Sequence, residues 1–161
     1  RAIKTNHHQL APDQLARIVG EYPPLAHYCN ALIVPHGATY THLFELSVLD
    51  SGPGFAATWT GTPLDQLPLD AEEAAVRACF GRGSAKGKSR FGEGLPHVMR
   101  LLRRQKGFLR LRTGRLSFYI DFSVEDQVGE AILQRYQQTD LAALAPVAGS
   151  LLTILIPMRR P

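Results

Sequence analysis

The sequence lacks any apolar run long enough to cross a membrane. A spanning helix needs about 20 consecutive apolar residues, whereas the longest mainly apolar stretch covers only residues 151–158. The first residues are polar and no apolar segment follows them, so the sequence predicts no secretion signal. We therefore expect no membrane contact. Because the chain begins with Arg1 rather than Met, we also expect it to be a fragment of a longer protein.

Cysteine is scarce as well. The two cysteines, Cys29 and Cys79, are too few for a disulfide framework and lack the CxxC spacing of many zinc sites. We expect both to be free thiols in a cytoplasmic protein. The six histidines show no metal-ligand spacing, which favours surface or hydrogen-bonded roles for them.

The net charge of the chain is also small. The chain has 18 Lys and Arg against 14 Asp and Glu, a net charge of +4. Such an excess is compatible with an anionic ligand or a weak contact with nucleic acid and does not distinguish between them. A length of 161 residues favours one domain, with a weakly patterned N-terminal part over 1–42 and a core over 43–157.

The N-terminal part offers few patterns. Residues 12–20 predict a short helix, after which Pro23 and Pro24 interrupt the chain. Residues 25–30 predict one or two further helical turns, and residues 31–34 form a short apolar run.

The core is more regular. Residues 43–50 alternate between apolar and polar side chains, as a strand does, and residues 109–112 and 116–122 do so on either side of a glycine turn. Residues 151–156 are apolar on both faces, which predicts a covered strand in the middle of a sheet.

Helices separate these strands. Asp70 and Glu73 have the spacing of a capping box at the start of one of them. Helices are predicted over residues 70–80, 95–106 and 125–138, and a loop that includes Trp59 is predicted to continue over 61–69. The order of the elements predicts an α+β sandwich of mostly antiparallel strands with helices on one face.

Three glycine-containing motifs occur in a fixed order within the core. The first, Asp50-Ser-Gly-Pro-Gly-Phe, ends a strand, and the second, Gly92-Glu-Gly-Leu, opens a helix. The third, Gly149-Ser150, leads into the last strand, which closes with Pro157.

The first motif suits the base of a nucleotide. The carboxylate of Asp50 at a strand end can accept a hydrogen bond from an exocyclic amine such as that of adenine. Gly52 and Gly54 remove side chains where a ring would lie against the backbone.

The second motif suits phosphate groups. Gly92 and Gly94 precede free N–H groups at a helix start, where the helix dipole favours negative charge. The loop before them carries Lys86, Lys88 and Arg90, which could close over the phosphates.

Together these motifs resemble those of the histidine kinase-like ATPase superfamily, the GHKL or Bergerat fold shared by gyrase, heat-shock chaperones and sensor kinases. The resemblance covers residues 43–157. It implies a two-layer α/β sandwich that binds ATP with Mg²⁺.

The resemblance also implies roles for particular residues. Asp50 would read adenine, Gly54 would give the ring access, and Gly92 to Leu95 would hold the phosphates. Residues 81–91 would form a lid over ATP. Ser150 stands where the family usually has Thr, and its hydroxyl can make the same hydrogen bond.

The family has a further helix upstream, in which an Asn holds Mg²⁺ and a Glu one turn earlier, or a neighbour, activates water. The similar string here is residues 25–31, in which Asn30 would be the Mg²⁺ ligand. Position 26 is Ala, however, and only 20 positions separate Asn30 from Asp50. The chain thus departs from the family pattern where hydrolysis depends on it.

Three functions stay open at this point. The first is an ATP-binding domain that acts as a conformational switch in a larger signalling, defence or remodelling protein, with other domains or a second copy as partners. The second is a domain of the same fold that binds no nucleotide and serves as an interaction module. The third is a basic domain that contacts nucleic acid through residues 100–106, Arg110 and Arg112. The intact glycine motifs favour the first function over the second, and nucleic acid is not the favoured partner.

Overall fold

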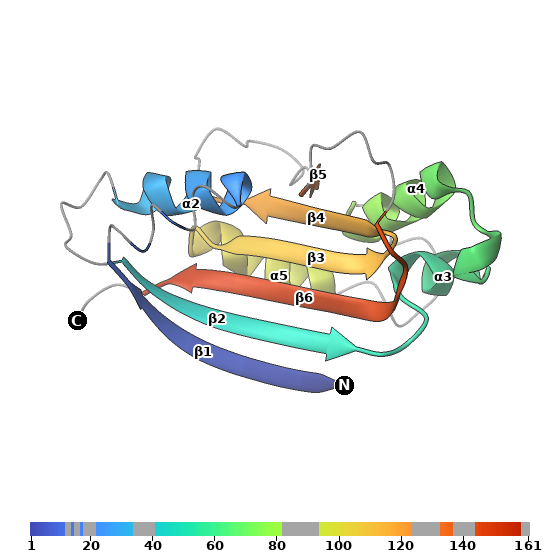
Figure 1. Cartoon of the computed structure of the whole chain (residues 1–161), viewed down its shortest axis with the longest axis horizontal. Coiled ribbons are helices and arrows are strands. Elements are labelled where there is room, and N and C mark those ends of the chain that lie inside the picture. Colours follow the sequence, from blue (N-terminus) through green and yellow to red (C-terminus); the bar gives the residue numbers. More distant parts are fainter. Residues whose placement is uncertain are drawn as a thin grey trace.

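The computed structural model describes residues 1–11, 14, 17, 22–33, 41–81, 94–123, 133–136 and 144–158. These residues form an α+β fold around a six-stranded antiparallel sheet with the strand order β1-β2-β6-β3-β4-β5 (Figure 1). The strands are β1 (Ala2–Leu10), β2 (Thr41–Asp50), β3 (Phe108–Gly114), β4 (Leu116–Asp121), β5 (Gln134–Arg135) and β6 (Val147–Pro157).

Four α-helices and one short 3₁₀ helix accompany the sheet. They are α2 (Pro23–Ile33), α3 (Phe55–Thr60), the 3₁₀ helix η1 (Leu64–Gln66), α4 (Leu69–Phe80) and α5 (Gly94–Arg104). No helix in the described part of the chain is long and apolar enough to span a membrane.

One face of the sheet, here called the covered face, carries the main core. Successive side chains of a strand point to opposite faces, and the register aligns Leu109 with Ile120 and with Ile154 on this face. Ala56 of α3, Val76 of α4 and Leu102 of α5 pack into the same cluster. Helices α3, α4 and α5 therefore lie on the covered face, and α5 is visible behind the sheet in Figure 1.

Helix α2 lies on the other face, here called the open face. Tyr28 and Cys29 are fully buried there against Leu43, Phe108 and other residues whose side chains point away from the main core. The prediction that the helices share one face is therefore wrong for α2. Its apolar side has a matching apolar surface at one end of the open face, and burial there removes both surfaces from water.

Most predicted core elements are confirmed. Strand β2, the β3–β4 hairpin and helix α5 lie where the periodicity placed them, and β6 occupies the middle of the sheet. The prediction that β6 is covered on both faces is wrong at Leu151, which is 40% exposed on the open face.

Other elements differ from prediction. Strand β1 was not predicted, and Trp59 belongs to helix α3 rather than to a loop. The predicted helix over 125–138 is wrong at Gln134–Arg135, which form strand β5, while 124–132 and 137–138 lie outside the described residues. Most of the predicted helix over 12–20 also lies outside them.

The start of α4 corrects the predicted capping box. The N-cap residue is Pro68, and no side chain caps this helix end. Asp70 lies within the first turn, and Glu73 does not reach back to the helix start, because its carboxylate accepts hydrogen bonds from Arg77 and Arg135. Tertiary and one-turn ion pairs have replaced the local cap.

Glu72 connects α4 to the β3–β4 turn. Its carboxylate is fully buried and accepts hydrogen bonds from the backbone N–H of Arg115 at 2.8 Å and from Arg115 Nε at 2.7 Å. Arg115 also donates to the carbonyl of Leu67, just before the helix. The two hydrogen bonds from Arg115 to this buried carboxylate orient α4 relative to the sheet.

We expect Glu72→Ala to destabilise the protein by about 3–5 kcal/mol, because removing one partner of a buried ion pair leaves the other uncompensated. Asp70→Ala is the matched control in the same helix, since Asp70 is exposed and contributes only about 0.3–1 kcal/mol through the helix dipole. Urea denaturation followed by circular dichroism measures both. Equal losses for the two variants would contradict the anchoring role of Glu72.

Candidate functional site

Three polar side chains meet at one end of the covered face. The register pairs Asp50 of β2 with Ser150 of β6, and Ser150 with Thr113 of β3. Each lies four residues along its strand from a residue of the main core, namely Leu46, Ile154 and Leu109, so all three share that face. The first and third glycine motifs are thereby brought side by side.

Asp50 is held by a turn of its own chain. Its Oδ1 accepts a hydrogen bond from the backbone N–H of Gly52 at 2.9 Å, and its Oδ2 accepts one from Arg1 Nε at 2.8 Å. The hydrogen bond from Gly52, followed by that from Arg1, lowers the pKa of Asp50 below its usual value. The carboxylate is therefore ionised at neutral pH, and its side chain stays 37% exposed. Asp50 thus remains an acceptor that a ligand can reach.

The two neighbouring motifs touch backbone to backbone. Gly149 has φ 77°, and a Cβ added there would lie 1.9 Å from the carbonyl oxygen of Asp50. Gly54 has φ 85°, and a Cβ there would lie 3.0 Å from Thr113 Oγ1 and 3.1 Å from the carbonyl oxygen of Gly149. Both positions require glycine for conformation and for space.

Thr113 joins these backbones and was missed by sequence reasoning. Its side chain is buried, donates to the carbonyl of Gly149 at 3.2 Å and accepts from the backbone N–H of Phe55 at 3.3 Å. The sequence did contain a signal for this residue. Leu109, Leu111 and Thr113 occupy alternate positions that face the core, and Thr113 is the polar one of the three. A polar residue at an inward strand position needs a partner.

Helix α5 directs its N-terminus toward the same end of the sheet. Its C-terminal part lies beside the start of β3, since a Cβ on Gly107 would lie 2.7 Å from Leu102 Cδ2. The helix rises about 1.5 Å per residue, and Val98 and Met99 pack on the core as it runs back along the covered face. Gly94, its first residue, is exposed and Leu95 is half-buried.

The described residues do not require a glycine at position 94. Gly94 does not adopt a left-handed φ, and a Cβ there would have no heavy atom of the described chain within 4 Å. Nothing in the described part of the fold therefore requires glycine at this position. The remaining predicted phosphate-side residues, Lys86, Lys88, Arg90 and Gly92, lie outside the described residues, as does the predicted lid apart from Gly81.

Asn30 is not brought to this site. It is exposed on α2, which packs on the open face against Leu43. Leu43 and Asp50 are seven residues apart on β2, or about 23 Å at the usual rise of a strand. Within the described residues, no three His, Cys, Asp or Glu side chains gather as a metal centre. The predicted metal ligand therefore has no partner set around it there.

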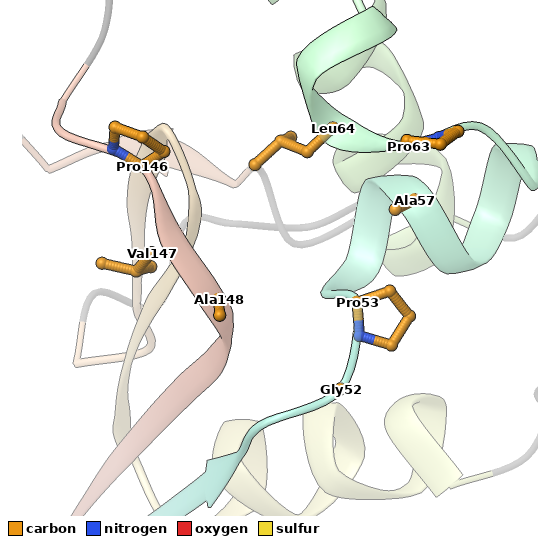
Figure 2. Close-up of a pocket in the computed structure, with 8 residues that line it drawn as sticks. All are labelled: Gly52, Pro53, Ala57, Pro63, Leu64, Pro146, Val147 and Ala148. Carbon is orange, nitrogen blue, oxygen red and sulfur yellow. The ribbon is translucent and has the colours of Figure 1, made fainter.

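A pocket of about 350 Å³ opens beside the Gly52–Pro53 turn. Figure 2 shows it between the start of β6 and the segment formed by α3 and η1. Its lining side chains are all apolar: Pro53, Ala57, Pro63, Leu64, Pro146, Val147 and Ala148, together with Gly52. Three of these residues are prolines, which have no backbone N–H to offer. The pocket can hold an apolar group but offers few hydrogen-bond donors.

Comparison with known proteins adds no relative. No protein-family model matches the chain, and neither curated proteins nor solved structures give a significant match.

We expect Gly149→Ala to destabilise the protein severely, by about 3 kcal/mol or more, because the methyl group overlaps the Asp50 carbonyl and the left-handed φ adds strain. Gly61→Ala is the matched control, since Gly61 has φ 71° but open space around its Cβ position. That variant should lose only about 1–2 kcal/mol from the conformation alone. Thermal and urea denaturation measure both variants, and similar losses would show that the close approach to Asp50 is unimportant.

Proposed function

We propose that this chain is an ATP-binding domain of the histidine kinase-like ATPase type and serves as a nucleotide-driven switch within a larger protein. The observation that carries the proposal is the pairing of Asp50 with Ser150 at one sheet end, between two glycines with positive φ. These are the motifs from which the sequence resemblance was drawn. The six-stranded antiparallel sheet with α3, α4 and α5 on one face is compatible with a two-layer sandwich of that type.

The proposed base site uses Asp50 and Ser150. An ionised carboxylate accepts hydrogen bonds only, and Asp50 keeps acceptor capacity beyond those used by Gly52 and Arg1. It would take the exocyclic amine of adenine, while the Ser150 hydroxyl would bond the ring or a water beside it. Guanine carries a carbonyl where adenine carries the amine, so it would present an acceptor to an acceptor.

The proposed phosphate site is the N-terminus of α5. Its first N–H groups have no partner within the helix, and Gly94 is exposed with room at its Cβ position. The cations Lys86, Lys88 and Arg90 precede this helix in sequence and would approach the phosphates from the loop. The base and the phosphates of ATP would then both lie on the covered face of the sheet.

Hydrolysis is not part of the proposal. The resemblance implies Mg²⁺ at Asn30, but Asn30 lies on the open face and away from Asp50. The described residues do not fit that role, and we derive no step through a metal ion. ATP binding by itself is sufficient for a conformational switch.

The placement of Asn30 favours a second candidate, an interaction module of this fold that binds no nucleotide. A nucleic-acid surface that combines residues 100–106 with Arg110 and Arg112 is not favoured. Arg110 and Arg112 alternate with Leu109 and Leu111 and thus point to the open face, whereas α5 lies on the covered face. The two basic groups therefore belong to different sides of the sheet.

We expect ATP to bind with measurable affinity and Asp50→Asn to weaken it tenfold or more. The substitution presents a donor to the adenine amine in place of an acceptor, so the hydrogen bond to the base is lost. Isothermal titration calorimetry with ATP and GTP, with and without Mg²⁺, measures the effect. Asp65→Asn is the control, because Asp65 is an exposed aspartate on η1 and should leave ATP affinity unchanged. Equal affinities of the wild type for ATP and GTP would rule out this base site, and absence of ATP binding would favour the interaction module.

We expect Gly94→Ala to separate the phosphate site from the base site. The free protein should keep its stability, because the added methyl group meets open space and alanine favours a helix. ATP affinity should fall while adenosine affinity does not, since adenosine has no phosphates to reach the helix start. Calorimetry with both ligands measures the difference. An equal fall for ATP and adenosine would contradict phosphate binding at α5.

A further inference from the structure

The segment from 94 to 120 contains seven cations and no acidic residue. The structure divides these cations into two groups. Three of them make contacts that hold the hairpin and its surroundings together. The other four lie on the exposed side of α5 and the turn after it, where Arg103 also lies over the Phe122 ring. The first group is Arg110, Arg112 and Arg115, and the second is Arg100, Arg103, Arg104 and Lys106.

The first group has structural roles. The Arg110 guanidinium lies 4.2 Å from the centre of the Tyr136 ring, in a cation–π contact. Arg112 donates to the carbonyls of Gly114 and Leu116 at 2.6 and 3.0 Å. Arg115 pairs with the buried carboxylate of Glu72 at 2.7 Å. These contacts give Arg110, Arg112 and Arg115 a structural role within the fold.

Helix α5 carries two stripes with the same spacing. The inward stripe is Leu95, Val98, Met99 and Leu102, and the outward stripe is His97, Arg100, Leu101 and Arg104. Both follow the i, i+3, i+4, i+7 pattern by which one side of a helix meets a partner. The inward stripe is half-buried or buried on the covered face, and every residue of the outward stripe is exposed.

The helix itself does not account for Arg100 and Leu101 of the outward stripe. Cations in the last turn of a helix are stabilised by its dipole, which explains Arg103 and Arg104. Arg100 lies in the middle, where the dipole has little effect, and its Nη2 lies 3.0 Å from His97 Nδ1 rather than from a carboxylate. Leu101 is 51% exposed between these cations. Leu101 belongs to neither apolar cluster of the described residues, so its exposed side chain is available to a partner.

We propose that the outward stripe of α5 docks an acidic amphipathic helix of a partner protein. Carboxylates one turn apart on such a helix would meet Arg100 and Arg104, which lie one turn apart here. An apolar side chain between them would cover Leu101. Arginine suits this role because its planar fork binds a carboxylate through two parallel hydrogen bonds.

Charge and shape both favour a polypeptide over a nucleic acid. Phosphates would satisfy Arg100 and Arg104, but a nucleic-acid backbone offers nothing apolar to Leu101. Helix α5 also has no Phe, Tyr or Trp on which bases could stack. The outward stripe faces away from the sheet, so its binding does not depend on the proposed nucleotide site.

The test uses a labelled synthetic peptide of about 20 residues, long enough to form a helix when bound, with Glu and Leu on one face and Ala elsewhere. Two further peptides replace every Glu by Gln or every Leu by Ala, and a short DNA duplex is the competing polyanion. Fluorescence anisotropy measures each Kd with the whole chain. We expect binding of the Glu-Leu peptide, about tenfold weaker binding of each altered peptide, and weaker binding of DNA.

Variants of the protein then locate the site. Arg100→Glu together with Arg104→Glu should weaken the Glu-Leu peptide about tenfold or more. Lys4→Glu together with Arg17→Glu changes the net charge equally at exposed positions elsewhere, and should have at most a small effect. Leu101→Ser should weaken the Glu-Leu peptide while leaving the Leu-free peptide unaffected. Circular dichroism verifies that each variant is folded.

Three results would overturn the proposal. They are no binding of the Glu-Leu peptide, equal loss of binding in the two charge-reversed variants, and no effect of Leu101→Ser on that peptide. If DNA binds more tightly than the peptide and Arg100→Glu with Arg104→Glu abolishes that binding, the stripe is a phosphate-binding surface instead.

Discussion

The close approach of Gly149 to Asp50 is the contact on which this end of the sheet depends. With any side chain at position 149, the start of β6 could not pass the carbonyl of Asp50, and the loop to α3 would have to move away. Thr113 then fixes both backbones through one hydroxyl. As a result, Asp50 and Ser150 face the same side of the sheet in a fixed relation, although 100 positions separate them in the sequence.

Local patterns were sufficient for the elements that follow one periodicity. The alternation in β2, β3 and β4 and the apolar stripe of α5 reflect burial on one face, which a sequence displays directly. Gly54 and Gly149 do require glycine, but for a left-handed φ and a close backbone approach rather than for the ring access by which the sequence singled out Gly52 and Gly54. For Gly94 the described residues show no such need, and its role in phosphate binding stays a proposal.

The sequence does not show which segments pair or pack together when they are far apart along the chain. Strand β1 carries mostly exposed polar residues on both sides, and only its pairing with β2 makes it a strand. The face on which α2 packs depends on Leu43 and Phe108, both remote in sequence. Glu73 matched a capping box with Asp70 locally, yet its carboxylate accepts a hydrogen bond from Arg135, 62 positions away. Such pairings are decided by tertiary packing rather than by local propensity.

The position of β6 has a consequence for biosynthesis. The last strand of the described chain lies between β2 and β3, and it is their only link through hydrogen bonds in the described sheet. A nascent chain can form the β1–β2 pair and the β3–β4 hairpin early, but the two halves cannot join until residues 147–157 leave the ribosome. Contacts of such sequence separation form slowly and leave unpaired strand edges exposed meanwhile. The sheet, and with it the juxtaposition of Asp50 and Ser150, is thus completed only after residues 147–157 have been synthesised.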